Sequence, residues 1–219
     1  RSALDKALAS LSYQALADLR RRWLDADPAK RAAVQLNAAE QAWLRAHPII
    51  HASNETDYPP FDFTVGGRPQ GFSIDLLNLL VERLGVQVDY VSGPPWVELE
   101  RLHREGRIDL LHSIYYTRER ASTGHYSEPY AQLRPVFVSR RADGAFASFE
   151  QLKGRTVAVG QGWSQDEFLR QRYPEIKRLQ VDNIEQMLQA VAEGRADATF
   201  EADEIVRYWI RKRGWRELQ

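Results

Sequence analysis

Two stretches of the chain carry nearly the same five residues, 88 positions apart. Residues 105–109 read EGRID, and residues 193–197 read EGRAD. In each copy an apolar helical stretch precedes the glycine and a short apolar run follows it, which is typical of a helix that ends at glycine and leads into a buried strand. The same offset relates Leu99 to Met187. The repeat predicts two similar α/β regions, although spacing alone leaves open a chance match between two common helix ends.

Short apolar runs alternate with helical stretches from residue 49 onward, which predicts an α/β fold with largely parallel sheets. The runs expected to form strands are residues 49–52, 86–91, 108–114, 136–139, 156–159, 178–181 and 198–200.

Serine and glycine signals predict where two helices begin and where one of them ends. We expect Ser73 to cap a helix over residues 74–84 that Gly85 ends, and Ser164 to begin another helix in a capping box with Glu167. Because ligands of parallel sheets bind beyond the carboxyl ends of the strands, residues 112–120 and 201–204 are the expected site segments.

Residues 1–46 read as helices. The last of them is expected to begin at Asn37, with Glu40 completing a capping box, and to stop before Pro48.

Charge and composition exclude several classes of function. The chain of 219 residues has 30 Lys and Arg against 30 Asp and Glu, so its net charge of zero argues against nucleic-acid binding. It has no cysteine, which excludes disulfides and thiolate catalysis. No apolar run reaches the length of a membrane helix, and the five histidines lack metal-ligand spacing, so neither a membrane span nor a metal site is expected within the sequence.

Two motifs are candidates for ligand contact. Two prolines follow Tyr58 and restrict the backbone, so Tyr58 is expected to be an exposed, ordered aromatic, with core filling as the alternative. Arg118 and Arg120 lie at a predicted strand end, where a guanidinium can bind a carboxylate in bidentate fashion or simply remain in a solvated turn.

The segment Gly160-Gln161-Gly162-Trp163-Ser164 imitates a dinucleotide fingerprint between a strand and a helix. Gln165 stands where the third glycine would be, and Trp163 crowds the loop that a pyrophosphate would approach. We therefore expect at most a smaller anion or polar group at this helix N-terminus.

Seven short motifs, in the right order, give the chain from residue 49 to about 214 a resemblance to the extracytoplasmic solute-binding proteins of the amino-acid-binding kind. They are residues 58–61, 71–75, 96–109, 117–120, 126–130, 152–154 and 157–162. The resemblance implies a bilobed, periplasmic-binding-protein-like (type II) Venus flytrap, with two α/β lobes of mainly parallel sheets that close on a ligand.

The resemblance also implies a set of ligand-binding residues. Arg120 would hold a ligand carboxylate beside Ser113 and Tyr115. Tyr58 and Trp96 would form an aromatic clamp with Glu55 next to it, and Gly162, Trp163 and Ser164 would form the loop of the second lobe that meets the ligand.

The pattern departs from the family at two of these positions. The acidic residue that receives a ligand amino group falls on Ala202, which leaves Glu201 and Asp203 as neighbouring candidates. Trp163 replaces a residue that is usually small, so it would either stack on a ligand or fill the cleft.

The resemblance implies a helical segment at residues 1–46, formed by the end of a preceding flytrap module and a connector helix, then lobe 1 at 47–134 and lobe 2 at 135–219. The return to lobe 1 is expected to be missing from the chain. A permuted module that uses residues 1–24 as its own closing helix is the alternative.

The expected function is a periplasmic sensor domain of a membrane-anchored bacterial signalling protein, either a histidine kinase or a diguanylate cyclase. Its partners would be an amino acid or small carboxylate (or no ligand at all), a neighbouring flytrap module and a second copy in a homodimer. We expect no cofactor, no metal and no catalysis in this chain. The alternatives are a free receptor of an amino-acid transporter and a dehydratase or lytic enzyme with the same fold, in which Glu55 or Glu201 would be the acid.

Overall fold

The computed structural model describes residues 34–122 and 124–219. The helices expected before residue 34 lie outside the described residues. The helix expected after Asn37 is confirmed as α3, Ala38–Ala46. Its capping box is confirmed too, since the Asn37 amide donates to Glu40 Oε2 (2.7 Å) and the Glu40 amide donates to Asn37 Oδ1 (2.9 Å). Trp43–Gln219 forms one compact unit, and this unit contains all the elements described next.

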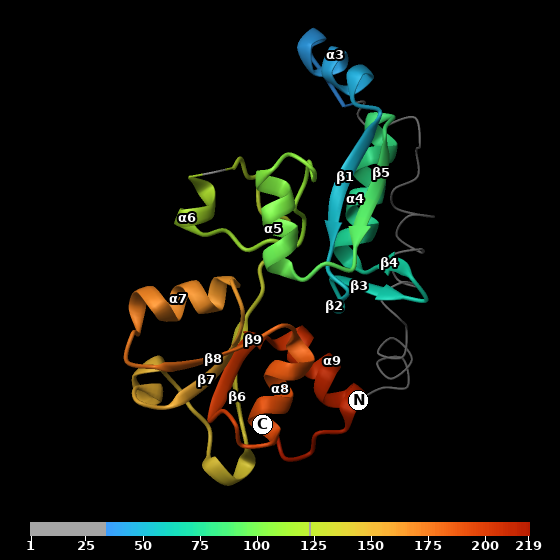
Figure 1. The fold of residues 1–219 in the computed structure, drawn as a ribbon. Helices are drawn as coiled ribbons and strands as arrows, with labels where there is room; N and C mark the ends of the chain where they lie inside the picture. The colour runs from blue at the N-terminus through green and yellow to red at the C-terminus, as the bar shows by residue number, and fades with distance from the viewer. Residues whose placement is uncertain (1–33, 123) are drawn as a thin grey trace, which may run out of the picture. The chain divides into compact units, whose positions relative to one another are not determined.

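The first part of this unit, up to residue 134, contains two small sheets. In one sheet β1 pairs in parallel with β5, and in the other β2, β3 and β4 form an antiparallel meander. Helix α4 packs beside β5 (Figure 1). The elements are β1 (Ile49–Asn54), β2 (Asp57–Tyr58), β3 (Asp62–Val65), β4 (Arg68–Gln70), α4 (Phe72–Leu84), β5 (Gln87–Ser92), α5 (Trp96–Arg104) and α6 (Arg118–Ala121).

The second part, from Pro135, is built on a four-stranded sheet of order β6-β9-β7-β8 (Figure 1). β7 pairs in parallel with β8 and β9, whereas β6 is antiparallel to β9. The elements are β6 (Pro135–Ser139), β7 (Thr156–Gly160), α7 (Ser164–Arg172), β8 (Lys177–Val181), α8 (Ile184–Ala192), β9 (Ala198–Ala202) and α9 (Asp203–Arg213).

The central strands of the four-stranded sheet, β7 and β9, are buried on both faces. Val157 and Val159 of β7 cluster with Leu169 of α7, whereas Ala158, on the opposite face, joins the cluster that contains α8 and α9. This alternation explains the continuous apolar run of β7, because a strand that is covered on both faces has no solvent side.

The repeated pentapeptide forms the same structure twice, which confirms the repeat as structural. Gly106 and Gly194 end α5 and α8 with φ angles of 71° and 78°. Each final aspartate then accepts the backbone amide of a neighbouring strand at 2.8 Å, Asp109 from His51 and Asp197 from Thr156.

The strand expected at residues 108–114 is wrong. The segment makes one parallel bridge, between Leu110 and Ala52, and then leaves the sheet. Ser113 has a φ of 58°, which no extended strand accommodates, and His112 Nε2 lies 2.6 Å from the carbonyl oxygen of Ser53.

Both serine caps expected on the helices are also wrong. Helix α4 begins two residues earlier than expected, at Phe72 after Gly71, whose φ is 125° and where a Cβ would lie 2.2 Å from the Phe61 carbonyl oxygen. Ser73 is therefore inside the helix and accepts the Tyr130 hydroxyl at 3.2 Å. Helix α7 has Trp163 at its N-cap and no side-chain cap, and Gly85 ends α4 as expected.

No helix in the described ranges, 34–122 and 124–219, is both long and apolar enough to cross a membrane.

Candidate functional site

Side chains from both parts of the unit line one pocket of about 290 Å³. The lining residues are Glu55, Tyr58, Trp96, Ser113, Ile114, Tyr115 and Arg120 from the first part, and Trp163, Ser164 and Gln165 from the second. Aromatic and aliphatic surface with a few converging polar groups is the usual composition of a small-molecule site.

A buried polar network at the end of β1 positions the Glu55 and Tyr58 side of the pocket. The Asn54 amide nitrogen donates to Asp62 Oδ1 (2.5 Å), and its oxygen accepts the hydroxyls of Thr64 (2.9 Å) and Ser92 (2.5 Å). The amide of Glu55 donates to Asp62 Oδ2 (3.0 Å). These bonds tie β1 to β3 and β5, so the loop that carries Glu55 leaves the strand in a fixed direction.

Burial keeps the ionisable groups of this network close to their neutral forms. It raises the pKa of Asp62 to about 7 and lowers the pKa of His112 to about 4. Burial, with the Asp62 and Asp57 carboxylates as smaller causes, also raises the pKa of Glu55. A pocket wall with so little net charge avoids the cost of burying unpaired ions.

Tyr58 is buried and 5% exposed, so the exposed platform expected from sequence is wrong. The Tyr58 and Tyr115 hydroxyls lie 3.2 Å apart, and each lies 3.3 Å from Glu201 Oε1. Gln165 donates to the other oxygen of Glu201 at 2.6 Å. Burial raises the pKa of Glu201 to about 7. Glu201 therefore joins two tyrosines of the first part to the second part from beneath the pocket.

Arg120 spans the pocket between the two parts. Thr117 caps α6 by accepting the Arg120 amide at 3.1 Å, which places the residue at the pocket wall. The guanidinium pairs with Glu100 (2.9 Å), donates to the Gly162 carbonyl oxygen (3.0 Å) and lies over the Trp96 ring at 5.1 Å. A planar cation with several fixed donors in an aromatic-lined pocket is suited to an anionic ligand group.

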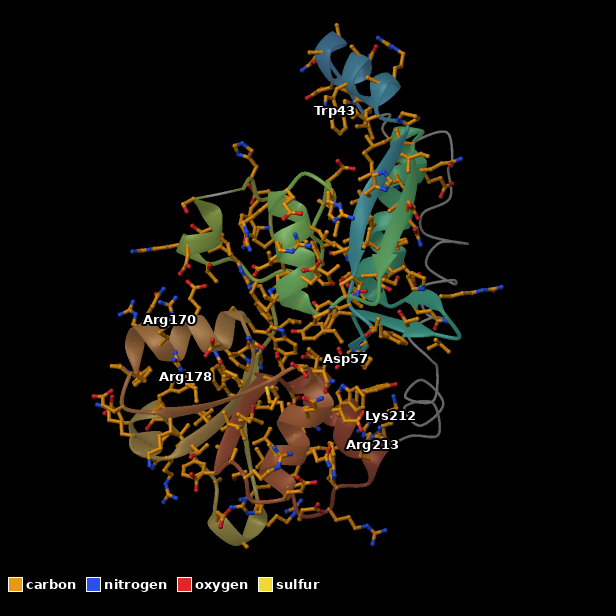
Figure 2. All side chains as sticks on the ribbon, in the orientation of Figure 1. Trp43, Asp57, Arg170, Arg178, Lys212 and Arg213 are labelled. Atoms are coloured by element: carbon orange, nitrogen blue, oxygen red, sulfur yellow. The ribbon has the colours of Figure 1, made fainter. Side chains whose placement is uncertain are left out.

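Two further contacts join the parts outside the pocket. Asp57 accepts the Ile184 amide (3.2 Å) at the start of α8, and burial raises the pKa of Asp57 to about 6. Arg170 of α7 pairs with Glu119 of α6 at 3.2 Å. Figure 2 labels Asp57 and Arg170, one in each contact.

Most of the residues expected at the site come together. Arg120, Tyr58, Trp96, Ser113, Tyr115, Glu55, Trp163 and Ser164 line the pocket, Gly162 adjoins it through its bond to Arg120, and Glu201 lies beneath it.

Asp203 does not line the pocket. Its carboxylate bonds Arg207 at 2.7 Å within the first turn of α9. Ile114 and Gln165 line it without having been expected there. The sequence carries one signal for Gln165. This residue stands where a dinucleotide-binding loop would have its third glycine, so the loop has a polar side chain at that position.

An α/β unit in two parts with an aromatic pocket between them is the architecture of a bilobed periplasmic-binding-protein-like (type II) Venus flytrap. The sequence profile of the bacterial extracellular solute-binding proteins, family 3, matches residues 50–212, and the chain belongs to this family.

Similar proteins include both sensors and solute receptors. The virulence sensor protein BvgS of Bordetella bronchiseptica is 29% identical over 177 residues, which cover 80% of this chain and 14% of BvgS. The crystal structure of the Bordetella pertussis BvgS VFT2 domain, a double mutant, is 28% identical with a TM-score of 0.73 and covers 84% of this chain and 79% of that one. A Gly52Ala mutant of arginine-bound ArgBP from T. maritima is 26% identical, with a TM-score of 0.72, over 82% of this chain and 84% of that one. The chain thus spans a small part of its sensor relative.

Proposed function

We propose that the chain is a periplasmic ligand-sensing domain of an inner-membrane bacterial signalling protein, a histidine kinase or a diguanylate cyclase. The proposal divides it into lobe 1 (residues 47–134) and lobe 2 (residues 135–219), with a neighbouring flytrap module and a homodimer as further partners. The ligand is an amino acid or small carboxylate held between the lobes.

The position of Arg120 carries this proposal. Its guanidinium contacts Glu100 of lobe 1 and reaches the Gly162 carbonyl oxygen of lobe 2, so it stands at the boundary between the lobes. A ligand whose carboxylate binds Arg120 there lies in the same pocket as Trp163 and Ser164 and can contact lobe 2 through them. A ligand that bridges two lobes favours the closed arrangement by its differential affinity, and the change in lobe position is the signal.

A free receptor of an amino-acid transporter is the second candidate. The likeness to arginine-bound ArgBP favours it, since that protein binds its ligand with the same fold. An enzyme is the third candidate. Of its two candidate acids, Glu55 lines the pocket, whereas the buried Glu201 carboxyl is held by Tyr58, Tyr115 and Gln165 and does not line it. In our proposal any kinase or cyclase activity belongs to other parts of the full-length protein.

Calorimetric titration of the chain with amino acids and small carboxylates tests the proposal. We expect saturable binding that Arg120→Ala weakens by roughly 2–5 kcal/mol, because the ligand anion loses a desolvated charge partner. Binding should also raise the melting temperature of the wild-type chain.

Arg118→Ala is the matched control, because Arg118 lies exposed on the same short helix. Equal losses in both variants would reduce the effect to general surface charge. Full affinity in Arg120→Ala would contradict the proposed site.

A further inference from the structure

Trp163 lies inside the pocket and is itself almost fully buried. Its side chain is 7% exposed, and its ring packs edge to face on Tyr58 with 6.1 Å between ring centroids. The space that remains beside it is about 290 Å³, and this figure includes the part of the pocket that is open to solvent. The indole therefore takes up room that a larger ligand would need.

The indole rests directly on the backbone of Gly160. A Cβ at Gly160 would lie 2.0 Å from Trp163 Cδ2 and 2.4 Å from both Cε2 and Cε3. Gly160 is not among the glycines with positive φ, so its backbone conformation does not require glycine. What requires glycine is the ring above it, and the two residues form a structural pair.

This pairing limits where the indole can move. The backbone of Gly160 closes one side of the ring, and the edge contact with Tyr58 lies on another. A ligand too large for the pocket therefore cannot push the ring back into the strand.

We propose that Trp163, seated on Gly160, sets the upper size limit of the ligand. The pocket accepts a carboxylate about as small as propionate, glycine or alanine, and it excludes amino acids with long side chains. This inference rests on the proposed function, since it specifies the ligand class of the same site.

Titration of wild type and Trp163→Ala with propionate, glycine, L-alanine, L-glutamine and L-arginine tests the limit. We expect the wild type to bind only the small ligands. Trp163→Ala should bind glutamine or arginine at least tenfold more tightly than the wild type does. Trp215→Ala is the control, because it removes an indole that packs on the same apolar cluster outside the pocket, and it should keep the wild-type ligand range.

Gly160→Ala tests the seat separately from the ligand. The added methyl group should displace the indole into the pocket, lower the melting temperature and abolish binding. In the Trp163→Ala background the same methyl group meets no ring, so the double variant should melt and bind like Trp163→Ala alone.

The outcomes separate this inference from the proposed function. Wild type that binds arginine as tightly as alanine, or Trp163→Ala with an unchanged ligand range, would overturn the size limit and leave the proposed function standing. If Gly160→Ala lowered the melting temperature equally in the wild type and in Trp163→Ala, the proposed contact between the indole and the Gly160 backbone would be wrong. If Trp163→Ala bound arginine while the wild type bound none of the ligands, the indole would fill the intact cleft, and the claim that the pocket accepts small carboxylates would be overturned. No binding by either protein would overturn both proposals.

Discussion

The two lobes use the same repeated pentapeptide but enclose very different amounts of apolar surface. Lobe 1 pairs only β1 with β5 beside its small meander, and its core forms small clusters such as Leu99, Leu102 and Ile108. Lobe 2 has a four-stranded sheet whose central strands, β7 and β9, are covered on both faces. Among the described residues, the large apolar side chains that remain exposed lie before Pro135, with the single exception of Phe168.

The difference shows that the local motif determines how a helix connects to a strand. The number of strands in the sheet determines how much apolar surface the lobe can bury. In lobe 1, hydrogen bonds between polar side chains also hold the strands together. Asn54 alone contacts three neighbours at the end of β1, and these bonds direct the loop that reaches the pocket.

Equivalent core truncations in the two lobes should give the largest effect. Leu99 and Met187 occupy matching repeat positions and are both fully buried. Alanine at such sites costs roughly 2–5 kcal/mol of unfolding free energy. We expect Met187→Ala near the upper end, because the surrounding lobe cannot collapse into the cavity, and Leu99→Ala near the lower end.

Urea unfolding of both variants measures this difference, with Leu79→Ala as the control because that side chain is 41% exposed. The control should change stability by no more than about 0.5 kcal/mol. If Leu99→Ala lost more unfolding free energy than Met187→Ala, the proposed difference between the cores of the two lobes would be wrong.

Glu201 belongs to lobe 2 but bonds tyrosines of lobe 1, so its titration reports on how the lobes meet. Burial raises its pKa from 4.5 to about 7. Between these values the folded protein keeps a proton that the unfolded chain has lost, so stability falls as pH rises through this window, by about 3 kcal/mol. Glu201→Gln should remove this component of the pH dependence.

Urea unfolding at pH 5 and pH 8 checks the prediction. The unfolding free energy of the wild type should fall relative to that of Glu201→Gln by about 3 kcal/mol between pH 5 and pH 8. Glu128→Gln, at an exposed carboxylate, should follow the wild type. Parallel profiles for wild type and Glu201→Gln would mean that the carboxyl ionises as it does in the unfolded chain.

Much of the fold could be predicted because its signals are local. The repeat, the glycine that ends α4 and the capping box at Asn37 each depend on a few adjacent residues, and all three are confirmed. The strand predicted at residues 108–114 was wrong because an apolar run has the same sequence pattern whether it enters a sheet or leaves it. What decides is the left-handed Ser113 and the contact of His112 with Ser53, a residue 59 positions away.

The resemblance to a family indicated which residues of lobe 1 belong to the site. It did not indicate how deeply they are buried or which side chains they contact. Sequence suggested that Tyr58 is exposed, but Trp163 and Glu201, both more than 100 positions away, bury it. Likewise, no local pattern assigns Gly160 to the indole three residues later, because the glycine has no unusual backbone angle to explain its presence.

The smallest predicted difference concerns the two glycines of the repeat. Both have left-handed φ angles, so alanine costs each about 1 kcal/mol. At Gly106 a Cβ would meet open space, but at Gly194 it would lie 3.2 Å from Arg140 Nη1. Arg140 is not free to yield, because the same nitrogen donates to the carbonyl oxygens of Val191 (2.6 Å) and Ala196 (3.0 Å).

Gly194→Ala should therefore destabilise the chain more than Gly106→Ala, by about 0.5–1 kcal/mol in urea unfolding, the scale of one weakened hydrogen bond. In an Arg140→Ala background the excess should disappear, since nothing then opposes the new methyl group. An excess that persists without Arg140 would place the cost in the backbone of lobe 2 itself. The matching turns would then differ in strain and not only in their surroundings.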